Sequence, residues 1–330
     1  MLAEHAKTAP DEAQKALAGL KKLQNMGALP TQDQMPIVAR AGRAVLRDYG
    51  GSGASVVFIP SLINPANILD ITPERSLLRW LNTQGLHPYL IDWGDVRAED
   101  HSLSVGDHVT DLIVPLIETL GAPAHLVGYC LGGTMALAAA HITNVQSLTM
   151  IAAPWHFAAY PDDAHAAMAK LWESAKPVAE AMGVLPMEAL QLMFWQLDPA
   201  GTIAKYARYA TMPEGGEEEA LFIAMEQWAN GGAPLPYAAA RELFEDFYAA
   251  NVAGQNEWQV AGRTITPDTL PCPMLDIISL NDKIVPSTTA TRHPNRLEIN
   301  RGHVGMLTGR HAKTDIWRPL RAWLSQLHKS

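Results

Sequence analysis

A glycine-flanked cysteine stands between an apolar segment and a run of small residues, and it restricts the possible folds more than any other feature of the chain. The stretch reads Leu126-Val127-Gly128-Tyr129-Cys130-Leu131-Gly132-Gly133-Thr134. The apolar residues predict a strand over 124–129, and the alanine-rich residues that follow predict a helix over 131–141. The turn between them would be so tight that positions 128 and 132 require glycine. We expect the chemistry at the thiol of Cys130, which stands at this corner.

The pattern Gly-x-Cys-x-Gly is the nucleophile elbow of α/β-hydrolase-type enzymes, with cysteine in place of the usual serine. The rest of the chain suits that fold, because predicted strands alternate with predicted helices. The strands are expected at 54–59, 86–91, 145–151, 274–280 and 296–299, and the helices at 72–81, 104–120 and 315–327. Such alternation predicts an α/β-hydrolase fold, a mostly parallel sheet with helices on both faces.

Three parts of the chain differ in pattern. Residues 11–25 have the apolar spacing of an amphipathic helix, whereas 37–49 are ambiguous and end at a glycine-rich turn. Between residues 155 and 256, helical segments interrupted by prolines and glycines indicate an inserted cap. The expected organisation is an N-terminal helical segment and linker (1–50), an α/β-hydrolase core (51–154 and 257–330) and a helical cap insertion (155–256).

Composition narrows the classes of partner. Of 330 residues, 48% are hydrophobic, which is enough for a large packed core. A formal net charge of -9 argues against nucleic-acid binding and against electrostatic attachment to anionic membranes. Two cysteines are too few for a disulfide framework, and a free thiol at Cys130 favours a reducing compartment. Because charges interrupt residues 1–30 and no apolar run has spanning length, we expect a cytoplasmic protein without a signal peptide.

An acid and a histidine follow the cap in the order that α/β-hydrolases use. Asp282 ends a buried strand, and His303 stands in a glycine-flanked loop just after another strand. Both are therefore expected at the carboxyl edge of the sheet, where ligands bind in open α/β folds. Asp276 is the rival acid, but it would lie in mid-strand and face the core unpaired, so we favour Asp282.

These three residue types have separate roles in acyl transfer. A cysteine thiol has an ordinary pKa of roughly 8.5, so His303 is needed to accept its proton. Asp282 would hold the imidazole in the useful tautomer. The oxyanion needs two N–H donors, for which we expect the backbone of Leu131 and of the loop residues Leu62 and Ile63.

Other residues have simpler explanations beside the functional ones. Cys130 alone would more often be a small core residue, and Asp282 alone an ordinary turn acid. Asn64, Tyr129 and Trp155 are the expected substrate contacts. The cap tryptophans can equally form the core of the cap: Trp155, Trp172, Trp195 and Trp228. We predict no metal site and no cofactor.

The elbow resembles the lipase-like box of the polyhydroxyalkanoate synthases, short type, within the α/β-hydrolase superfamily. Further segments resemble that family in the same order: Ile63-Asn64-Pro65-Ala66-Asn67, Tyr89-Leu90-Ile91-Asp92-Trp93-Gly94, Ala153-Pro154-Trp155-His156-Phe157, Met225-Glu226-Gln227-Trp228, Tyr248-Ala249-Ala250-Asn251, Asn281-Asp282-Lys283-Ile284-Val285-Pro286 and Gly302-His303-Val304-Gly305. The chain departs from the family at Gly231, where an aspartate would be expected.

The resemblance implies an acyltransferase that loads a 3-hydroxyacyl group from coenzyme A onto Cys130 and extends a polyester by transesterification. His303 would activate the cysteine, and Asp282 would orient the histidine or activate the incoming hydroxyl. It also implies a homodimer or a partner subunit and a place at a polyester granule surface. Two alternatives stay open: a cysteine-nucleophile hydrolase that cleaves esters, thioesters or polyester, and a non-catalytic granule-associated relative.

Overall fold

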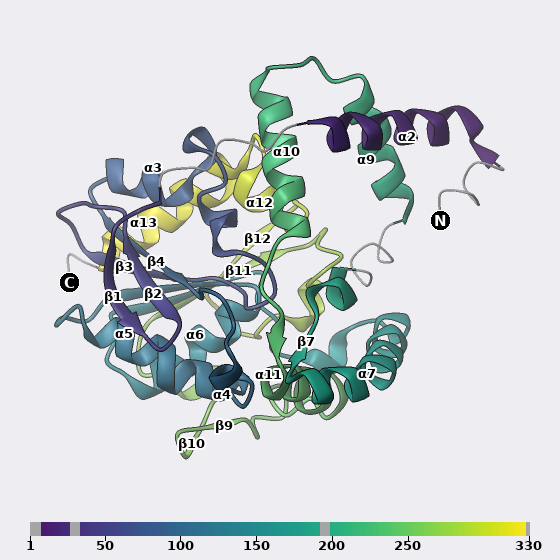
Figure 1. Ribbon diagram of the computed structural model, residues 1–330. Helices are drawn as coiled ribbons and strands as arrows, with labels where there is room; N and C mark the ends of the chain where they lie inside the picture. The colour runs from purple at the N-terminus through teal and green to yellow at the C-terminus, as the bar shows by residue number, and fades with distance from the viewer. Residues whose placement is uncertain (1–7, 27–33, 192–198, 328–330) are drawn as a thin grey trace.

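An eight-stranded sheet organises the chain (Figure 1). A computed structural model describes residues 8–26, 34–191 and 199–327. In sheet order the strands are β1 (Ile37–Ala41), β2 (Ala44–Asp48), β4 (His87–Asp92), β3 (Ser55–Ile59), β5 (His125–Tyr129), β6 (Ser147–Ile151), β11 (Met274–Ser279) and β12 (Arg296–Ile299). All neighbours from β4 to β12 are parallel, and β1 and β2 pair antiparallel. The predicted fold class, a mostly parallel sheet with helices, is confirmed.

The sheet begins earlier than the sequence indicated. Residues 1–50 were expected to be a helical segment and linker, but 37–48 form a hairpin whose second strand lies antiparallel along β4, with Leu46 opposite Ile91. Ala44 and Leu46 are completely buried. The arginines at positions 40, 43 and 47 break the usual alternation of polar and apolar residues, so the hairpin has no clear local signal.

Helices cover both faces of the sheet (Figure 1). One face carries α3 (Leu77–Thr83), α12 (Gly305–Thr308) and α13 (Arg318–Leu327), and the other carries α5 (Val114–Glu118) and α6 (Leu131–Ile142). Alternate residues of β3 divide between the two cores: Val56 and Phe58 belong to the first, Val57 and Ile59 to the second. This period of two is what a strand buried on both faces requires.

The helix predicted over 104–120 is interrupted near its middle. It consists of α4 (Val105–Asp107), the π-helical segment η4 (His108–Ile113) and α5. The Ser104 side chain accepts a hydrogen bond from the backbone N–H of Asp107 and so caps the start. Pro115 has no N–H to donate to the carbonyl four residues earlier, and the wider π turn lies immediately before it.

A helical region is inserted between β6 and β11. Its elements are α7 (Asp162–Met182), β7 (Val184–Leu185), α9 (Pro199–Ala210), α10 (Glu217–Asn230), β8 (Leu235–Pro236), α11 (Tyr237–Arg241) and the π-helical η6 (Glu242–Ala249). A two-stranded ribbon follows, β9 (Gln259–Val260) and β10 (Arg263–Thr264). Short helical turns are η1 (Ala66–Leu69), η2 (Pro73–Arg75), η3 (Ala98–Asp100), η5 (Phe157–Ala159), η7 (Pro267–Thr269), η8 (Ser287–Thr289) and the π-helical η9 (Lys313–Trp317).

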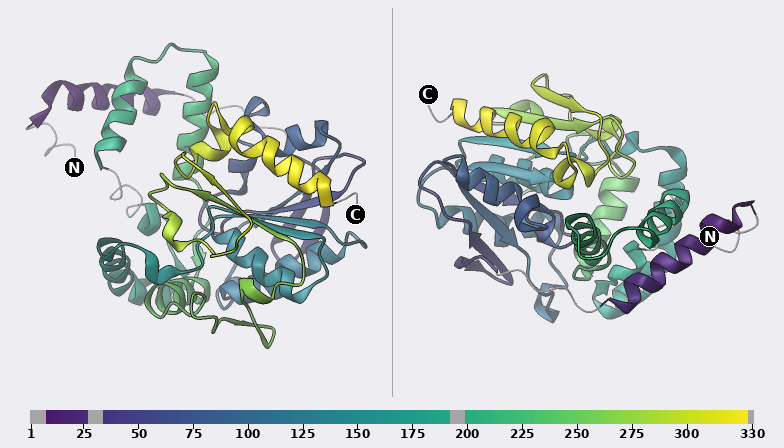
Figure 2. Two further views of the ribbon diagram at one scale, coloured as in Figure 1. Left: turned by 180° about the vertical axis from the view of Figure 1, so that it is seen from behind. Right: turned by 90° about the horizontal axis from the view of Figure 1, so that it is seen from above.

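The first described helix, α2 (Pro10–Asn25), lies across α9, as Figures 1 and 2 show from three sides. Its buried positions, Ala13, Ala16 and Gly19, recur every three residues, so small side chains let the two helices approach closely. An ion pair of 2.8 Å joins Lys22 to Glu219 near the start of α10. Helix α2 is therefore an outer layer of the inserted region. In the described part of the chain, no helix is long and apolar enough to cross a membrane.

Candidate active site

Cys130 occupies a strained turn between β5 and α6. Its backbone has φ 55° and ψ -133°, outside the regions that non-glycine residues normally adopt. Such a conformation costs about 1–3 kcal/mol and persists only where its surroundings impose it. A side chain at Gly128 would collide with the backbone of Gly132 and Gly133, and one at Gly132 with the carbonyl of Ile59. The two glycines therefore allow the turn that presents the thiol.

His303 and Asp282 lie together at the carboxyl edge of the sheet. The Nδ1 of His303 donates to Oδ2 of Asp282 at 2.6 Å. The other carboxylate oxygen accepts from the backbone N–H groups of Ile284 (2.8 Å) and Val285 (2.9 Å). The Asp282 side chain is fully buried, so these three bonds replace water around the carboxylate. With Nδ1 bonded to Asp282, Nε2 is the ring nitrogen that is left for Cys130.

The charge on Cys130 is coupled to the charge on His303. Burial lowers the pKa of the imidazole, but the negative charge of Cys130 and hydrogen bonds with Asp282 and Cys130 raise it, to about 10 overall. The imidazolium form is therefore stabilised when the cysteine is ionised. A proton shared between these two groups suits a cysteine nucleophile that must work near neutral pH.

Tyr129 packs against His303 and, with it, lines a cavity that is described below. Its ring stacks on His303 with centroids 4.9 Å apart, and its hydroxyl donates to the backbone carbonyl of His303 at 3.1 Å. Burial raises the pKa of the phenol well above its ordinary value, so the hydroxyl keeps its proton. Tyr129 was expected to contact the substrate, and in the structure it also stacks on His303 and bonds to its backbone.

A cavity of about 200 Å³ joins these groups. Cys130, His303 and Tyr129 line it, together with Ile63 and Asn64 of the loop after β3. Of the three expected substrate contacts, Asn64 and Tyr129 thus face the cavity. The thiol, the imidazole and the asparagine loop therefore face one common cavity.

The tryptophans of the inserted region have different positions. Trp155 is only 1% exposed, packs against Trp258 at 6.4 Å between ring centroids, and is not among the residues that line the cavity. Trp172 is buried against Phe244, and Trp228 is buried but also lines the cavity. Trp195 lies outside the described residues.

The expected oxyanion donors differ in what their amides already bind. Leu131 is the first residue of α6, so its N–H has no partner within the helix. The Ile63 N–H donates to Oγ of Ser61 at 3.2 Å, which turns that amide toward its own loop. Leu62 has a buried side chain and is not among the residues that line the cavity, whereas Ile63 is.

An ion pair from the inserted helices also lines the cavity, and sequence reasoning did not single it out. Lys205 of α9 pairs with Glu226 of α10 at 2.6 Å, and the hydroxyl of Tyr206 donates to the other oxygen of Glu226 at 2.6 Å. The two charges are 21 positions apart on different helices, so no local pattern joins them. The one signal was indirect: Glu226 lies in a segment that resembles the synthase family.

Asp276, the rival acid, does not line the cavity. It is completely buried in β11, where Oδ2 accepts from the hydroxyl of Thr291 and Oδ1 has no partner. Burial raises its pKa to about 7, against the bonds from Thr291. In the described part of the chain, no group of three His, Cys, Asp or Glu side chains could hold a metal ion.

Solved structures identify the fold class. An esterase from Thermogutta terrifontis matches with a TM-score of 0.52 and 16% identity, over 91% of this chain and 100% of that one. An epoxide hydrolase from Vigna radiata matches with a TM-score of 0.53 and 14% identity, over 88% and 98%. At such identities the likeness shows the fold alone. The strand order and these matches show that the chain has the α/β-hydrolase fold.

Curated relatives are more specific. The chain is 28% identical over 291 residues to the poly(3-hydroxyalkanoate) polymerase subunit PhaC of Haloferax mediterranei, and 27% over 309 residues to that of Haloarcula marismortui. These alignments cover 82% and 87% of this chain but 58% and 64% of the relatives, so the chain spans about three fifths of their length. PhaC of Allochromatium vinosum is 26% identical, over 82% of this chain and 80% of its own. No protein-family profile matches the chain. The chain is therefore a homologue of these polymerase subunits, as the resemblance in its sequence indicated.

Proposed function

We propose that this protein is a polyhydroxyalkanoate-synthase-like acyltransferase, which transfers 3-hydroxyacyl groups from coenzyme A to a growing polyester through Cys130, His303 and Asp282. The observation that carries the proposal is the cysteine on its strained elbow, in one cavity with a histidine that donates to a buried aspartate. The names of the curated relatives support the polymer product.

The first half-reaction loads the enzyme. Nε2 of His303 takes the proton of the Cys130 thiol, and the thiolate attacks the carbonyl carbon of the coenzyme A thioester. Backbone N–H groups of Leu131 and the loop after β3 stabilise the oxyanion. The carbon–sulfur bond to coenzyme A then breaks, and the imidazolium returns its proton to the departing thiolate, which leaves the acyl group on Cys130.

The second half-reaction elongates the chain. His303 accepts the proton of an incoming hydroxyl, whose oxygen attacks the acyl carbon on Cys130. An ester bond forms, the bond to sulfur breaks, and the proton restores the thiol. Water in place of the chain hydroxyl would release a free acid, so exclusion of water from the cavity decides between synthase and hydrolase.

The proposal also covers the assembly of the protein and its location in the cell. The word "subunit" in the relatives' names supports assembly as a homodimer or with a partner subunit. We propose action in the cytoplasm at the surface of a polyester granule.

Incubation of purified protein with 3-hydroxybutyryl-coenzyme A tests the proposal, with thiol release and product mass both measured. Release of coenzyme A with formation of high-mass polyester is expected. Free 3-hydroxybutyrate as the sole product would identify a hydrolase instead, and the absence of turnover would contradict both enzyme functions. Cys130→Ala should abolish release, whereas the matched variant Cys272→Ala should retain it, because Cys272 does not line the cavity.

A further inference from the structure

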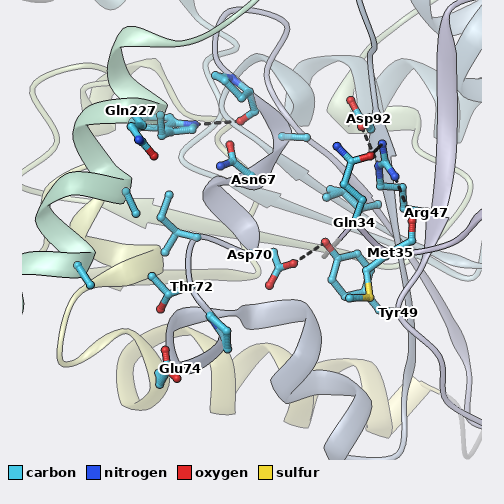
Figure 3. A pocket seen from close by; sticks show the side chains of 18 of the residues that line it. Gln34, Met35, Arg47, Tyr49, Asn67, Asp70, Thr72, Glu74, Asp92 and Gln227 are labelled. Carbon is cyan, nitrogen blue, oxygen red and sulfur yellow. Dashed lines mark hydrogen bonds and ion pairs between the residues drawn. The ribbon is translucent and has the colours of Figure 1, made fainter. Parts of the chain in front are cut away.

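A second and larger hollow adjoins the reaction cavity. It encloses about 1000 Å³, roughly five times the volume of the reaction cavity, and lies at the upper end of the range for ligand sites. Figure 3 shows it between three walls. The first is the end of β2 together with residues 34–35, the second is the segment of η1 and η2, and the third is helix α10. We call this hollow the side groove.

The side groove and the reaction cavity share Pro65 and Trp228 as lining residues. The indole N–H of Trp228 donates to the backbone carbonyl of Pro65 at 2.9 Å, which joins α10 to the loop before η1. This contact is the partition between the two spaces.

Helix α10 presents different faces to the two spaces. Ala220, Ala224 and Gln227, spaced at four and three residues, line the side groove, whereas Glu226 and Ala229 line the reaction cavity. The segment η1 is divided in the same way, with a different set of its side chains on each side. Both elements therefore form a wall between the two spaces, with one set of side chains on each side.

The charges of the side groove disfavour an anionic ligand. Arg47 is the single Lys or Arg among the described residues that line it, and its Nε donates to Asp92 at 2.7 Å. Three further carboxylates line the same space, those of Asp70, Glu74 and Glu217, and arginines outside the lining pair with two of them, Arg79 with Asp70 and Arg75 with Glu217. Coenzyme A carries several phosphate charges, and here it would meet carboxylates and arginines that are already paired rather than a positive site.

The remaining surface suits a neutral chain of esters and methyl groups. Ile71, Leu90 and Trp228 supply apolar area, and the exposed amides of Asn67 and Gln227 can donate hydrogen bonds to ester carbonyls. Figure 3 shows these two amides on facing elements, η1 and α10. Ester oxygens only accept hydrogen bonds, so amide donors beside apolar side chains match an oligoester better than a polyhydroxylated ligand.

We propose that the side groove binds the neutral oligoester product next to the Cys130 site, and that Trp228 and Pro65 form the threshold between elongation and exit. This inference rests on the proposed synthase function. The thioester substrate would use another approach to the reaction cavity, because the arginines at the groove are already paired with carboxylates.

A binding measurement tests the side groove independently of catalysis. Cys130→Ala protein, which cannot turn over, is titrated with an oligo(3-hydroxybutyrate) methyl ester, followed by calorimetry. Ala220→Trp fills the groove from an exposed position on α10, and Asn67→Trp does so from the opposite wall if the first variant fails to fold. The matched control is Glu218→Trp, an exposed residue of α10 outside the groove. We expect the filled grooves to bind the oligoester about tenfold more weakly or worse, the equivalent of about 1.4 kcal/mol, and the control to bind as the parent does.

The product of each variant gives the second readout. With Cys130 present, the groove variants should make a shorter polymer per enzyme than Glu218→Trp does. Unchanged oligoester affinity and unchanged product mass in both groove variants would overturn the inference while leaving the synthase function intact. Displacement of the oligoester by coenzyme A would also overturn it. If the parent makes no polymer but the Cys130→Ala protein binds the oligoester in the groove, the synthase function fails and the binding site stands.

Discussion

Asp282 holds His303 with one carboxylate oxygen and its own loop with the other. Nδ1 of the imidazole donates to Oδ2 at 2.6 Å, while Oδ1 accepts two backbone N–H groups. The position of the acid is thus set by its backbone, and the histidine is oriented by the acid. Tyr129 stacks on one face of the imidazole ring. The imidazole is therefore held on two sides before any substrate arrives.

Chemical modification should separate the two cysteines. Burial raises the pKa of Cys272 to about 11, so this thiol should react slowly with iodoacetamide at pH 7.5. Cys130 lines the cavity beside His303 and should be alkylated first. Peptide mass spectrometry after partial labelling checks the order, and preferential labelling of Cys272 would contradict it.

Replacement of Asp282 by asparagine should weaken catalysis without unfolding the protein. The amide oxygen can still accept from Ile284 and Val285, but the negative charge that helps to raise the pKa of His303 is lost. We expect kcat/KM for thioester cleavage to fall by about a thousandfold or more, as in other triads.

The pH dependence of Cys130 alkylation supplies a separate check on Asp282. The thiolate–imidazolium pair should form less readily in Asp282→Asn, so labelling at neutral pH should slow. Asp276→Asn is the matched control, since Asp276 is the rival acid. A larger effect at Asp276 than at Asp282 would reverse their assignment.

Asp276 should make the protein less stable as the pH rises. Its pKa is about 7 in the folded state because of burial, against about 3.9 for an unfolded chain. The folded state therefore keeps a proton that the unfolded state releases, and this contribution, present in full below pH 3.9, is lost as the pH rises through 7. The difference amounts to at most about 4 kcal/mol.

Asp276→Asn should remove this pH-dependent contribution to the free energy of unfolding, because the amide has no proton to lose in this range. Urea unfolding at pH 5 and pH 8 measures it: the free energy of unfolding should fall more between the two values in the parent than in the variant. Equal changes in both proteins would mean that Asp276 does not titrate there.

Gly19→Val should detach α2 from α9. A side chain at position 19 would overlap the carbonyl oxygen of Tyr206. Overpacking of this kind costs about 1–3 kcal/mol, and because α9 carries Lys205 of the cavity wall, KM should rise as the helix moves. Limited proteolysis and steady-state kinetics check both effects. Ala18→Val adds the same side chain at an exposed position of the same helix and should change neither.

Local signals were enough for the parallel part of the fold. Glycines at 128 and 132 around Cys130 define a turn that few other residues would allow, and each of the first three predicted strands was followed by a helical pattern. Sequence order also named Asp282 and His303, which lie 2.6 Å apart in the structure. Their catalytic roles remain predictions that the experiments above address.

Long-range pairing was beyond the sequence. The β1–β2 hairpin pairs with β4, and no pattern within residues 37–48 predicts that pairing. The Lys205–Glu226 pair and the side groove depend in the same way on how distant helices dock. Such features are set by tertiary packing rather than by periodicity along the chain.

The left-handed backbone at Cys130 sets a limit on how this protein can be made more robust. Glycine at that position would relieve about 1–3 kcal/mol of conformational strain, so selection for heat resistance alone would favour loss of the thiol. Directed evolution that selects only for survival on heating, without a screen for coenzyme A release, would therefore favour variants that have lost the reactive thiol.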